Sequence, residues 1–227
     1  MADDLSPTMR DYLAEIYRLS DRSPAADNRF ISTSALADVL DVSAPAVNRM
    51  VTRLKEMALL DHEPYHGIRL TEAGEREALK ELRRHRIAES FLVEVMGFGW
   101  HEVHAEANSM SSGLSDVLAE RMAIMAGNPT HCPHGEPIPS AEGVIERPDD
   151  MLLSAAPAGD DPLVITRVLT RESDRLEYLA ALGLIPGAQV QLIHLSPFNG
   201  PMQLKMGDEY RIIGHNLAEF IRVAKTS

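Results

Sequence analysis

Residues 32–55 read STSALADVLDVSAPAVNRMVTRLK. Ser32-Thr33-Ser34 can cap a short helix with an apolar face, and a tight turn follows at Asp41-Val42-Ser43. The next helix opens with Pro45 in its first turn, where the missing N–H of proline costs no hydrogen bond. A short helix, a tight turn and a second helix are typical of a DNA-binding helix-turn-helix. An ordinary helical hairpin is the alternative interpretation.

The second helix of this stretch would place its first turns in the major groove of DNA. There Arg49 can read guanine, while Ala44 and Pro45 can pack on thymine methyl groups. Residues 59–63 and 68–71 then flank the sequence Pro64-Tyr65-His66-Gly67, which predicts a β-hairpin and so the winged form of the motif. The residues that we expect at the DNA are Ser43, Ala44, Pro45, Asn48, Arg49, Arg53, Tyr65 and His66.

The remaining pattern predicts a chain that is mainly α with small β parts. Apolar residues at helical spacing predict helices over residues 7–19, 71–95 and 100–125. Short β-rich runs predict strands at residues 163–166, 189–195, 203–205 and 210–213, with a short helix at 174–182. The strands form a small C-terminal β-barrel of roughly 65 residues, a size at which an independent core is marginal.

Composition shifts divide the chain into four segments. The segment between the helices and the strands is rich in proline, glycine and aspartate, as linkers are. We expect a winged helix-turn-helix domain at 1–74, a helical domain at 75–127, a linker at 128–160 and the β-barrel at 161–227.

Overall composition excludes several classes of protein. With 227 residues and 44% hydrophobic content the chain is globular, and its single cysteine excludes an internal disulfide framework. No signal peptide or membrane-spanning run is visible, so we expect a cytoplasmic protein without a membrane partner. A net charge of −12 argues against a non-specific nucleic-acid coat, but a local arginine patch can still bind DNA.

His85 and Glu89 lie four residues apart in the predicted helix over 71–95, so they share one helix face. His104 can approach them from the next helix. Two imidazoles and one carboxylate suit a divalent ion such as iron, manganese, zinc or nickel. The alternative is a histidine pair packed in a helical interface, with Glu89 in a surface salt bridge.

The linker holds another cluster of soft ligands, Thr130-His131-Cys132-Pro133-His134-Gly135. A second metal site is one interpretation of this cluster. A loop with a buried, inert cysteine is the other, and the lack of a second cysteine favours it.

These motifs together resemble the diphtheria toxin repressor family of metal-dependent regulators. The resemblance rests on the winged helix, on His85-Arg86-x-x-Glu89, on Val103-His104-x-Glu106 and on Cys132-Pro133-His134-Gly135-Glu136-Pro137. It runs nearly end to end, and it implies that the middle domain dimerises. It also implies that the last domain is SH3-like.

The resemblance implies two metal positions. The ancillary position takes two histidines and a glutamate, which match His85, Glu89 and His104, plus oxygen ligands from the SH3-like domain, where Glu172 and Asp174 lie. At the primary position, Asp11 matches a first-helix ligand. Here the chain departs from the family, because the cluster that follows His104 is made of the weak neutral ligands Asn108, Ser111 and Ser112. Glu106 is a nearby carboxylate that could rebuild this position.

A further departure concerns a small anion, which in relatives is held near an arginine that matches Arg86. Glu136 stands where those relatives have an asparagine. We hypothesise that Glu136 takes the place of the anion, either by pairing with Arg86 or by ligating the metal.

The resemblance implies a homodimeric, manganese- or iron-responsive regulator that binds an inverted repeat of double-stranded DNA and represses metal-uptake genes. Zinc, cobalt or nickel could substitute as the ion, and no small organic substrate is expected. One alternative is a regulator of the same fold that no longer senses metal. The other is a non-haem metalloenzyme, because two histidines and a carboxylate also form the facial triad of iron oxygenases.

Overall fold

A computed structural model describes residues 5–22, 30–111 and 113–226. Its described residues form two compact units. The first combines Met1–His85 with Ser111–Asp116 and Pro139–Ile145, and the second combines Arg86–Met110 with Val117–Ile138 and Glu146–Ser227. No helix in the described ranges is long and apolar enough to cross a membrane.

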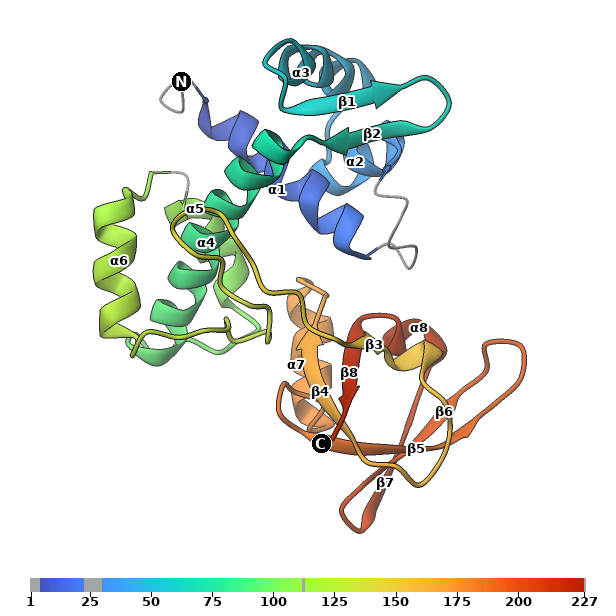
Figure 1. Ribbon diagram of the computed structural model, residues 1–227. Helices are drawn as coiled ribbons and strands as arrows, with labels where there is room; N and C mark the ends of the chain where they lie inside the picture. The colour runs from blue at the N-terminus through green and yellow to red at the C-terminus, as the bar shows by residue number, and fades with distance from the viewer. Residues whose placement is uncertain (1–4, 23–29, 112, 227) are drawn as a thin grey trace. The chain divides into compact units, whose positions relative to one another are not determined.

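The first unit contains the predicted winged helix-turn-helix (Figure 1). Its elements are α1 (Pro7–Arg22), α2 (Thr33–Leu40), α3 (Ala44–Glu56), β1 (Leu60–Glu63) and β2 (Gly67–Leu70). The Ser32 hydroxyl caps α2 by accepting a hydrogen bond from the Ala35 N–H at 3.1 Å. Asp41 ends α2 in a left-handed conformation, which leads the chain directly into α3.

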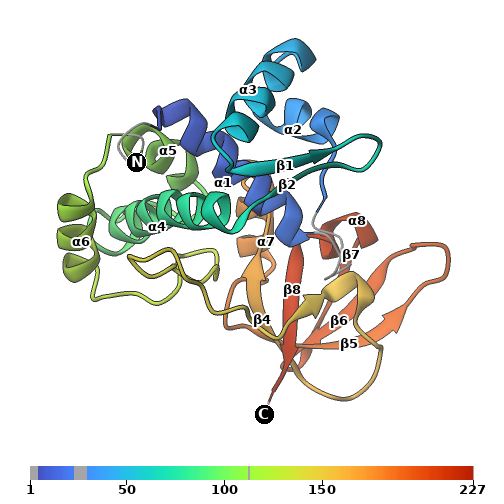
Figure 2. The same cartoon turned by 45° about the horizontal axis from the view of Figure 1, so that its top comes forward.

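An apolar core holds these elements together. Figure 2 shows α3 close to the β1–β2 hairpin. Fully buried side chains include Leu13, Leu36, Leu54 and Ile68. Gly67 is required beside this core, because a Cβ there would lie 2.2 Å from the Ile31 carbonyl oxygen and φ is +108°. The close approach lets Ile31 and Ile68 exchange two backbone hydrogen bonds, each 2.9 Å long.

The long helix α4 (Glu72–Glu94) confirms the prediction for residues 71–95. The single helix predicted over residues 100–125 is wrong, because the structure has α5 (Val103–Ser111) and α6 (Asp116–Met125) instead. Ser111-Ser112-Gly113 is a run of weak helix formers, and Leu114 turns back to donate to the Ser111 carbonyl at 3.2 Å. Asp116 then starts α6 with a negative charge at the positive end of the helix dipole.

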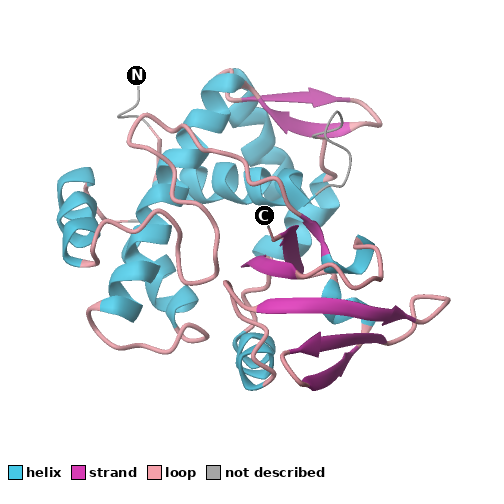
Figure 3. Cartoon of the chain, turned by 60° about the horizontal axis from the view of Figure 1, so that its bottom comes forward, coloured by secondary structure: helices cyan, strands magenta, loops and turns pink. Residues whose placement is uncertain are grey.

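The C-terminal part of the second unit is a six-stranded antiparallel sheet (Figure 3). Its strand order is β3-β8-β4-β5-β6-β7. The elements are β3 (Met151–Leu152), η2 (Leu153–Ala155), β4 (Leu163–Val168), α7 (Ser173–Ala181), β5 (Gln189–Leu195), β6 (Met202–Met206), β7 (Glu209–Ile213), α8 (His215–Ala218) and β8 (Ile221–Lys225). The four predicted strands and the predicted helix are present. The structure adds β3, α8 and β8.

Strand β8 pairs with β3 on one side and with β4 on the other. Its residues Ile221 and Val223 are fully buried and complete the core of the sheet. Alternation is visible in its burial pattern, with Arg222 and Ala224 on the more open side. Trp100, which lies in the turn before α5, packs against the same core.

Asp150 anchors the segment that leads into the sheet. Its side chain is fully buried and accepts hydrogen bonds from Arg167 Nε at 2.7 Å, Arg222 Nη1 at 2.9 Å and Thr166 Oγ1 at 2.9 Å. Burial alone raises the pKa of this carboxyl, but Arg167, Thr166 and Arg222 outweigh that effect and hold the pKa below its usual range. A carboxylate on the segment thus ties β4 and β8 to it.

We predict that Asp150→Asn destabilises the folded chain by about 3–5 kcal/mol at pH 7, because it leaves buried guanidinium groups without their counterion. The pKa of Asp150 is lower in the folded state than in the unfolded state, where it is about 4. Above about pH 4 the ionised carboxyl therefore stabilises the folded chain in full. This stabilisation is lost as the pH falls through the folded-state pKa. Urea unfolding at several pH values measures both effects. Asp149→Asn, at an exposed neighbour, is the control. Equal stability of the two variants at pH 7 contradicts the prediction.

Candidate metal centre

Three of the predicted ligands come together on helices α4 and α5. The donor atoms of His85, Glu89 and His104 all lie within 4.8 Å of one another. Glu89 is 3% exposed and its Oε1 lies 3.2 Å from His104 Nδ1. His85 stands one turn earlier on α4 and is also buried. The structure therefore confirms the convergence that the spacing predicted.

A second group of donors shares the same carboxylate. Cys132 and His134, on the loop before the sheet, form a buried group with Glu89. His134 Nδ1 lies 3.5 Å from Glu89 Oε1 and 4.0 Å from Cys132 Sγ. The Oε1 atom of Glu89 thus faces two imidazoles, one from α5 and one from the loop.

Backbone contacts fix the loop that carries Cys132 and His134. The His134 carbonyl accepts a hydrogen bond from the Val168 N–H of β4 at 2.9 Å. Gly135 has φ of +82°, and a Cβ there would lie 2.0 Å from the Thr166 carbonyl oxygen. Only glycine allows this approach of loop and strand. On its other side the loop is held by Arg86, whose Nη1 donates to the Pro137 carbonyl at 2.6 Å.

The pKa values of Cys132 and His134 are shifted because both groups are buried beside Glu89. Burial lowers the pKa of His134, but Cys132 and Glu89 more than offset this and raise it to about 11. Burial, followed by the charge of Glu89, raises the pKa of the Cys132 thiol. The surroundings of His134 therefore favour its protonated form, whose charge balances the Glu89 carboxylate. Metal ligands must lose such protons, so a bound cation would take over the balancing role.

His134 also contacts Trp100, the single tryptophan of the chain. Its Nε2 lies 2.8 Å from the Trp100 carbonyl oxygen, and the two ring centroids are 5.5 Å apart. The first contact leaves Nδ1 as the ring atom that faces Glu89 and Cys132. The indole is therefore a reporter of events at the centre.

The carboxylates predicted from the last domain are not among these grouped donors. Glu172 precedes α7, its side chain is 68% exposed, and its Oε1 pairs with Arg175 Nη1 at 3.1 Å. The Arg175 guanidinium in turn lies over the Phe220 ring, 4.1 Å from the centroid. Recruiting Glu172 to a metal requires its release from Arg175. Asp174 is exposed in the first turn of α7.

The residues predicted for the primary position are not grouped as metal donors among the described residues either. Asp11 lies on α1 in the first unit, where desolvation and then the neighbouring Glu81 raise the pKa of its carboxyl. Glu106 and Asn108 are exposed on α5 in the second unit, and Asn108 Nδ2 lies 3.3 Å from His104 Nε2. Ser111 is buried, whereas Ser112 lies outside the described residues.

The residues predicted to contact DNA are all exposed. Ser43 directly precedes α3. The predicted residues on α3 itself present their side chains to solvent. Tyr65, at the hairpin tip, is fully exposed with φ of +67°. His66 lies 6.1 Å from the Phe30 ring, over which the Arg69 guanidinium also packs. Helix α3 and the wing thus offer polar and basic groups from one compact domain.

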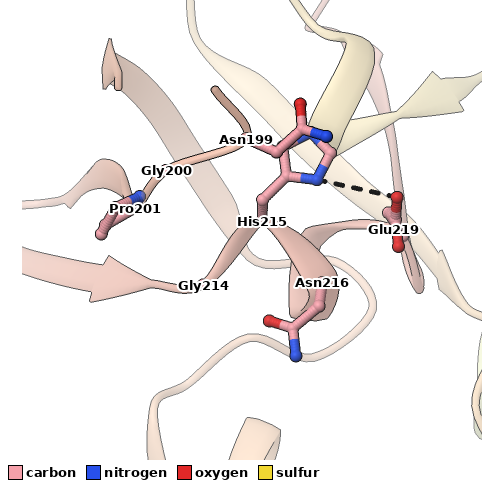
Figure 4. Close-up of a pocket in the computed structure, with 7 residues that line it drawn as sticks. All are labelled: Asn199, Gly200, Pro201, Gly214, His215, Asn216 and Glu219. Carbon is pink, nitrogen blue, oxygen red and sulfur yellow. Dashed lines mark ion pairs between the residues drawn. The ribbon is translucent and has the colours of Figure 1, made fainter. Parts of the chain in front are cut away.

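A separate surface pocket of about 370 Å³ lies on the C-terminal sheet, between the β5–β6 loop and α8 (Figure 4). Its titratable lining groups are His215 and Glu219, whose Nδ1 and Oε1 atoms are 3.6 Å apart. One imidazole and one carboxylate are too few to match the donor groups around Glu89. The pocket is therefore not the metal centre.

Sequence reasoning underestimated Cys132 and His134. The sequence favoured a buried, inert cysteine. Cys132 is buried, but its side chain and that of His134 lie close to the Glu89 carboxylate, which the sequence did not predict. The Cys-x-His spacing was the available signal. The missing information was the fold of the loop, which brings these side chains to Glu89, a carboxylate far earlier in the chain.

Comparison with known proteins agrees with this arrangement. Residues 4–68 match the N-terminal DNA-binding domain of iron-dependent repressors, and residues 71–140 match their metal-binding and dimerisation domain. Residues 151–225 match the FeoA domain. The iron-dependent repressor IdeR of Mycobacterium tuberculosis is 32% identical over 98% of this chain and 99% of its own length. The chain belongs to the iron-dependent repressor family.

Further relatives support membership of this repressor family. The diphtheria toxin repressor of Corynebacterium efficiens is 27% identical over 98% of this chain and 97% of its own. A manganese-dependent transcriptional repressor in complex with manganese has a TM-score of 0.88 and 31% identity, covering 96% of this chain and 100% of its own. ScaR with bound Zn²⁺ has a TM-score of 0.81 and 28% identity, over 96% and 99%. The family is one of metal-dependent, DNA-binding repressors rather than enzymes.

We predict that Glu89→Gln weakens metal binding more than His104→Ala or His134→Ala does. Each histidine variant removes a donor from one group, whereas Glu89→Gln removes the charge that both groups share. The expected loss for Glu89→Gln exceeds the roughly 10–100-fold typical of changes to outer-shell groups. Quenching of Trp100 fluorescence during Mn²⁺ titration measures it. His101→Ala is the matched control on a histidine outside both groups. If Glu89→Gln binds Mn²⁺ as tightly as either histidine variant does, the two donor groups do not share the Glu89 carboxylate.

Proposed function

We propose that this chain is a cytoplasmic, homodimeric repressor of metal-uptake genes, which binds an inverted-repeat operator when a divalent ion occupies the centre around Glu89. The observation that carries the proposal is the sharing of this one buried carboxylate by His85 and His104 on one side and Cys132 and His134 on the other. Imidazole, carboxylate and thiolate together suit a first-row divalent ion. The relatives are named as iron- or manganese-dependent, and one is named with bound Zn²⁺. Zinc, cobalt or nickel can substitute in this chain.

The ion would supply positive charge that holds the loop at 132–137 against α4. Because the same loop bonds β4 through Val168 and meets it at Gly135, binding would also order the contact between loop and sheet. An ion that binds one arrangement of these elements more tightly shifts the population towards it. A coupling of about 1–3 kcal/mol then changes operator affinity about 5–150-fold.

Dimerisation would use the exposed face of α6. Val117, Leu118, Ile124 and Met125 are between 51% and 76% exposed, although their side chains are apolar. Such a patch on the dimerisation domain is explained by a partner that covers it. Two copies related by a twofold axis would present two α3 helices to the two half-sites of an inverted repeat.

We predict that Mn²⁺ or Fe²⁺ raises the operator affinity of the wild-type chain, and that His85→Ala abolishes this increase while leaving metal-free DNA binding unchanged. The reason is that His85 ligates the ion and is distant in sequence from α3. Fluorescence anisotropy with an operator duplex, with and without metal, measures both affinities. His101→Ala is the control. Identical metal responses of wild type and His85→Ala exclude control through this centre, and no response in wild type supports a regulator that has lost metal sensing.

We predict that Arg49→Ala weakens operator binding by about 1–3 kcal/mol and relaxes the preference at one base pair, as expected for loss of a guanine contact. The measurement is operator affinity across single-base variants at several salt concentrations. Lys205→Ala, which removes a positive charge from β6, controls for net charge. If the two variants weaken binding equally at every base, Arg49 contributes only general electrostatic attraction.

A further inference from the structure

Residues 139–145, here called the strap, lie along the first half of α4 within the first unit. The Pro139 carbonyl accepts a hydrogen bond from Arg83 Nη1 at 2.8 Å. Gly143 lies against Arg76, whose carbonyl oxygen would be 2.6 Å from a Cβ at this glycine. Arg76 and Arg83 are seven residues apart, so they lie on the same face of α4. The strap is therefore packed along two turns of this helix.

The strap keeps its shape through hydrogen bonds around Ser140 and ends in an apolar core. The Ser140 N–H donates to the Val144 carbonyl at 2.8 Å, and the Ser140 carbonyl accepts from the Gly143 N–H at 3.1 Å. Gly143 is buried with φ of +76°, so a side chain there would meet both backbone strain and the Arg76 carbonyl. Ile145 packs against the core of the winged helix, which also holds the buried side of α3.

A stiff sequence, Pro137-Ile138-Pro139, joins the strap to the loop at 132–137, which carries donors of the metal centre. Each proline has a fixed φ, and the residue before a proline is confined to extended conformations. The carbonyls of the two prolines are held by Arg86 Nη1 at 2.6 Å and by Arg83 Nη1 at 2.8 Å. Glu136 makes the predicted pair with Arg86, Oε2 to Nη2 at 3.0 Å. The connection therefore has little slack, and a shift of the loop is passed on to the strap.

We propose that the strap transmits the metal-dependent ordering of the loop at 132–137 to the winged helix, with Pro139 and Gly143 as its positioning residues. Coupling between sites is carried by contiguous contacts, and the strap has them at both ends. An ion that orders the loop lowers the cost of ordering the strap, and through Ile145 it favours one packing of the winged-helix core. The metal signal rests on the proposed function, whereas the mechanical connection follows from the strap contacts alone.

Hydrogen exchange of the metal-free full chain tests the mechanical connection. Gly135→Ala strains the loop at its contact with β4, because φ is +82° and a Cβ there would lie 2.0 Å from the Thr166 carbonyl oxygen. Amides of the strap and of the first half of α4 should then exchange about 5–30-fold faster, as the strain of a non-glycine residue at positive φ implies. Gly187→Ala is the matched control, because φ is +88° but no atom lies within 4 Å of the added Cβ. It should leave these amides unchanged.

The connection should also act in the reverse direction. The Cys132 N–H donates to the Glu136 carbonyl at 2.9 Å and the Gly135 N–H to the Cys132 carbonyl at 2.8 Å, so exchange at these amides reports opening of the loop. Gly143→Ala, which strains the strap, should accelerate both. If neither Gly135→Ala nor Gly143→Ala changes exchange at the far end of the connection, the proposal is overturned.

Operator binding with and without Mn²⁺ tests the metal signal. Gly143→Ala detaches the strap from α4, and Pro139→Gly adds slack while keeping the carbonyl that binds Arg83. Both variants should bind Mn²⁺ as tightly as wild type, followed by quenching of Trp100 fluorescence. The factor by which Mn²⁺ raises operator affinity, about 5–150-fold for a typical coupling, should fall towards one. Because coupling is reciprocal, operator DNA should also cease to raise their Mn²⁺ affinity. Gly187→Ala should respond like wild type.

The possible results separate the two proposals. A wild-type metal response in both Gly143→Ala and Pro139→Gly overturns transmission through the strap. A loss of Mn²⁺ affinity that accounts for the lost response overturns it as well, because the strap would then only support the metal centre. If Gly143→Ala does not fold, Pro139→Gly decides. If wild type shows no metal response but Gly135→Ala loosens the strap, the connection stands and the proposed function fails.

Discussion

The buried carboxylate of Glu89 is the constraint on which the packing of α4, α5 and the loop at 132–137 depends. A carboxyl group that is 3% exposed needs partners that offer positive charge or hydrogen bonds. Two imidazoles approach the same oxygen, His104 at 3.2 Å and His134 at 3.5 Å. Because these two imidazoles come from different elements, both contacts form when α5 and the loop pack on α4. The charge requirement of one side chain thus dictates a tertiary arrangement.

The contacts around this carboxylate extend its influence into the sheet. The backbone of His134 bonds β4, Gly135 touches the strand where no Cβ fits, and Arg86 holds the following residues from the side of α4. Helix α4 itself belongs to both units, since its first half contributes Ala78 and Leu82 to the core below the winged helix. One continuous helix therefore contributes residues to the core of the winged helix and, in its second half, the grouped side chains His85 and Glu89.

Local chemistry made much of this architecture predictable. Ser32, Asp41 and Pro45 specify helix starts and a turn within a few residues, and i, i+4 spacing places His85 and Glu89 on one face. The break between α5 and α6 was not predicted, because apolar periodicity continues across Gly113. Strand β8 and the approach of Cys132 to Glu89 depend on contacts between residues far apart in the chain. The long-range folding of the loop, which is set by Gly135 and Arg86, has no local signature.

The buried carboxylates of Glu81 and Glu89 are balanced by different groups, and this difference bears on where metal can act. In the first unit, Glu81 is 3% exposed and pairs with Arg84, whose Nη2 lies 2.6 Å from Glu81 Oε2. Arg84 also reaches Asp116 at 2.9 Å. A guanidinium does not lose its proton, so the charge that faces Glu81 persists. Around Glu89 the balancing groups are imidazoles, which can exchange a proton for a metal ion. Of these two arrangements, the one around Glu89 has the groups that could hold a metal ion, and it lies on helix α4, which contributes to both units.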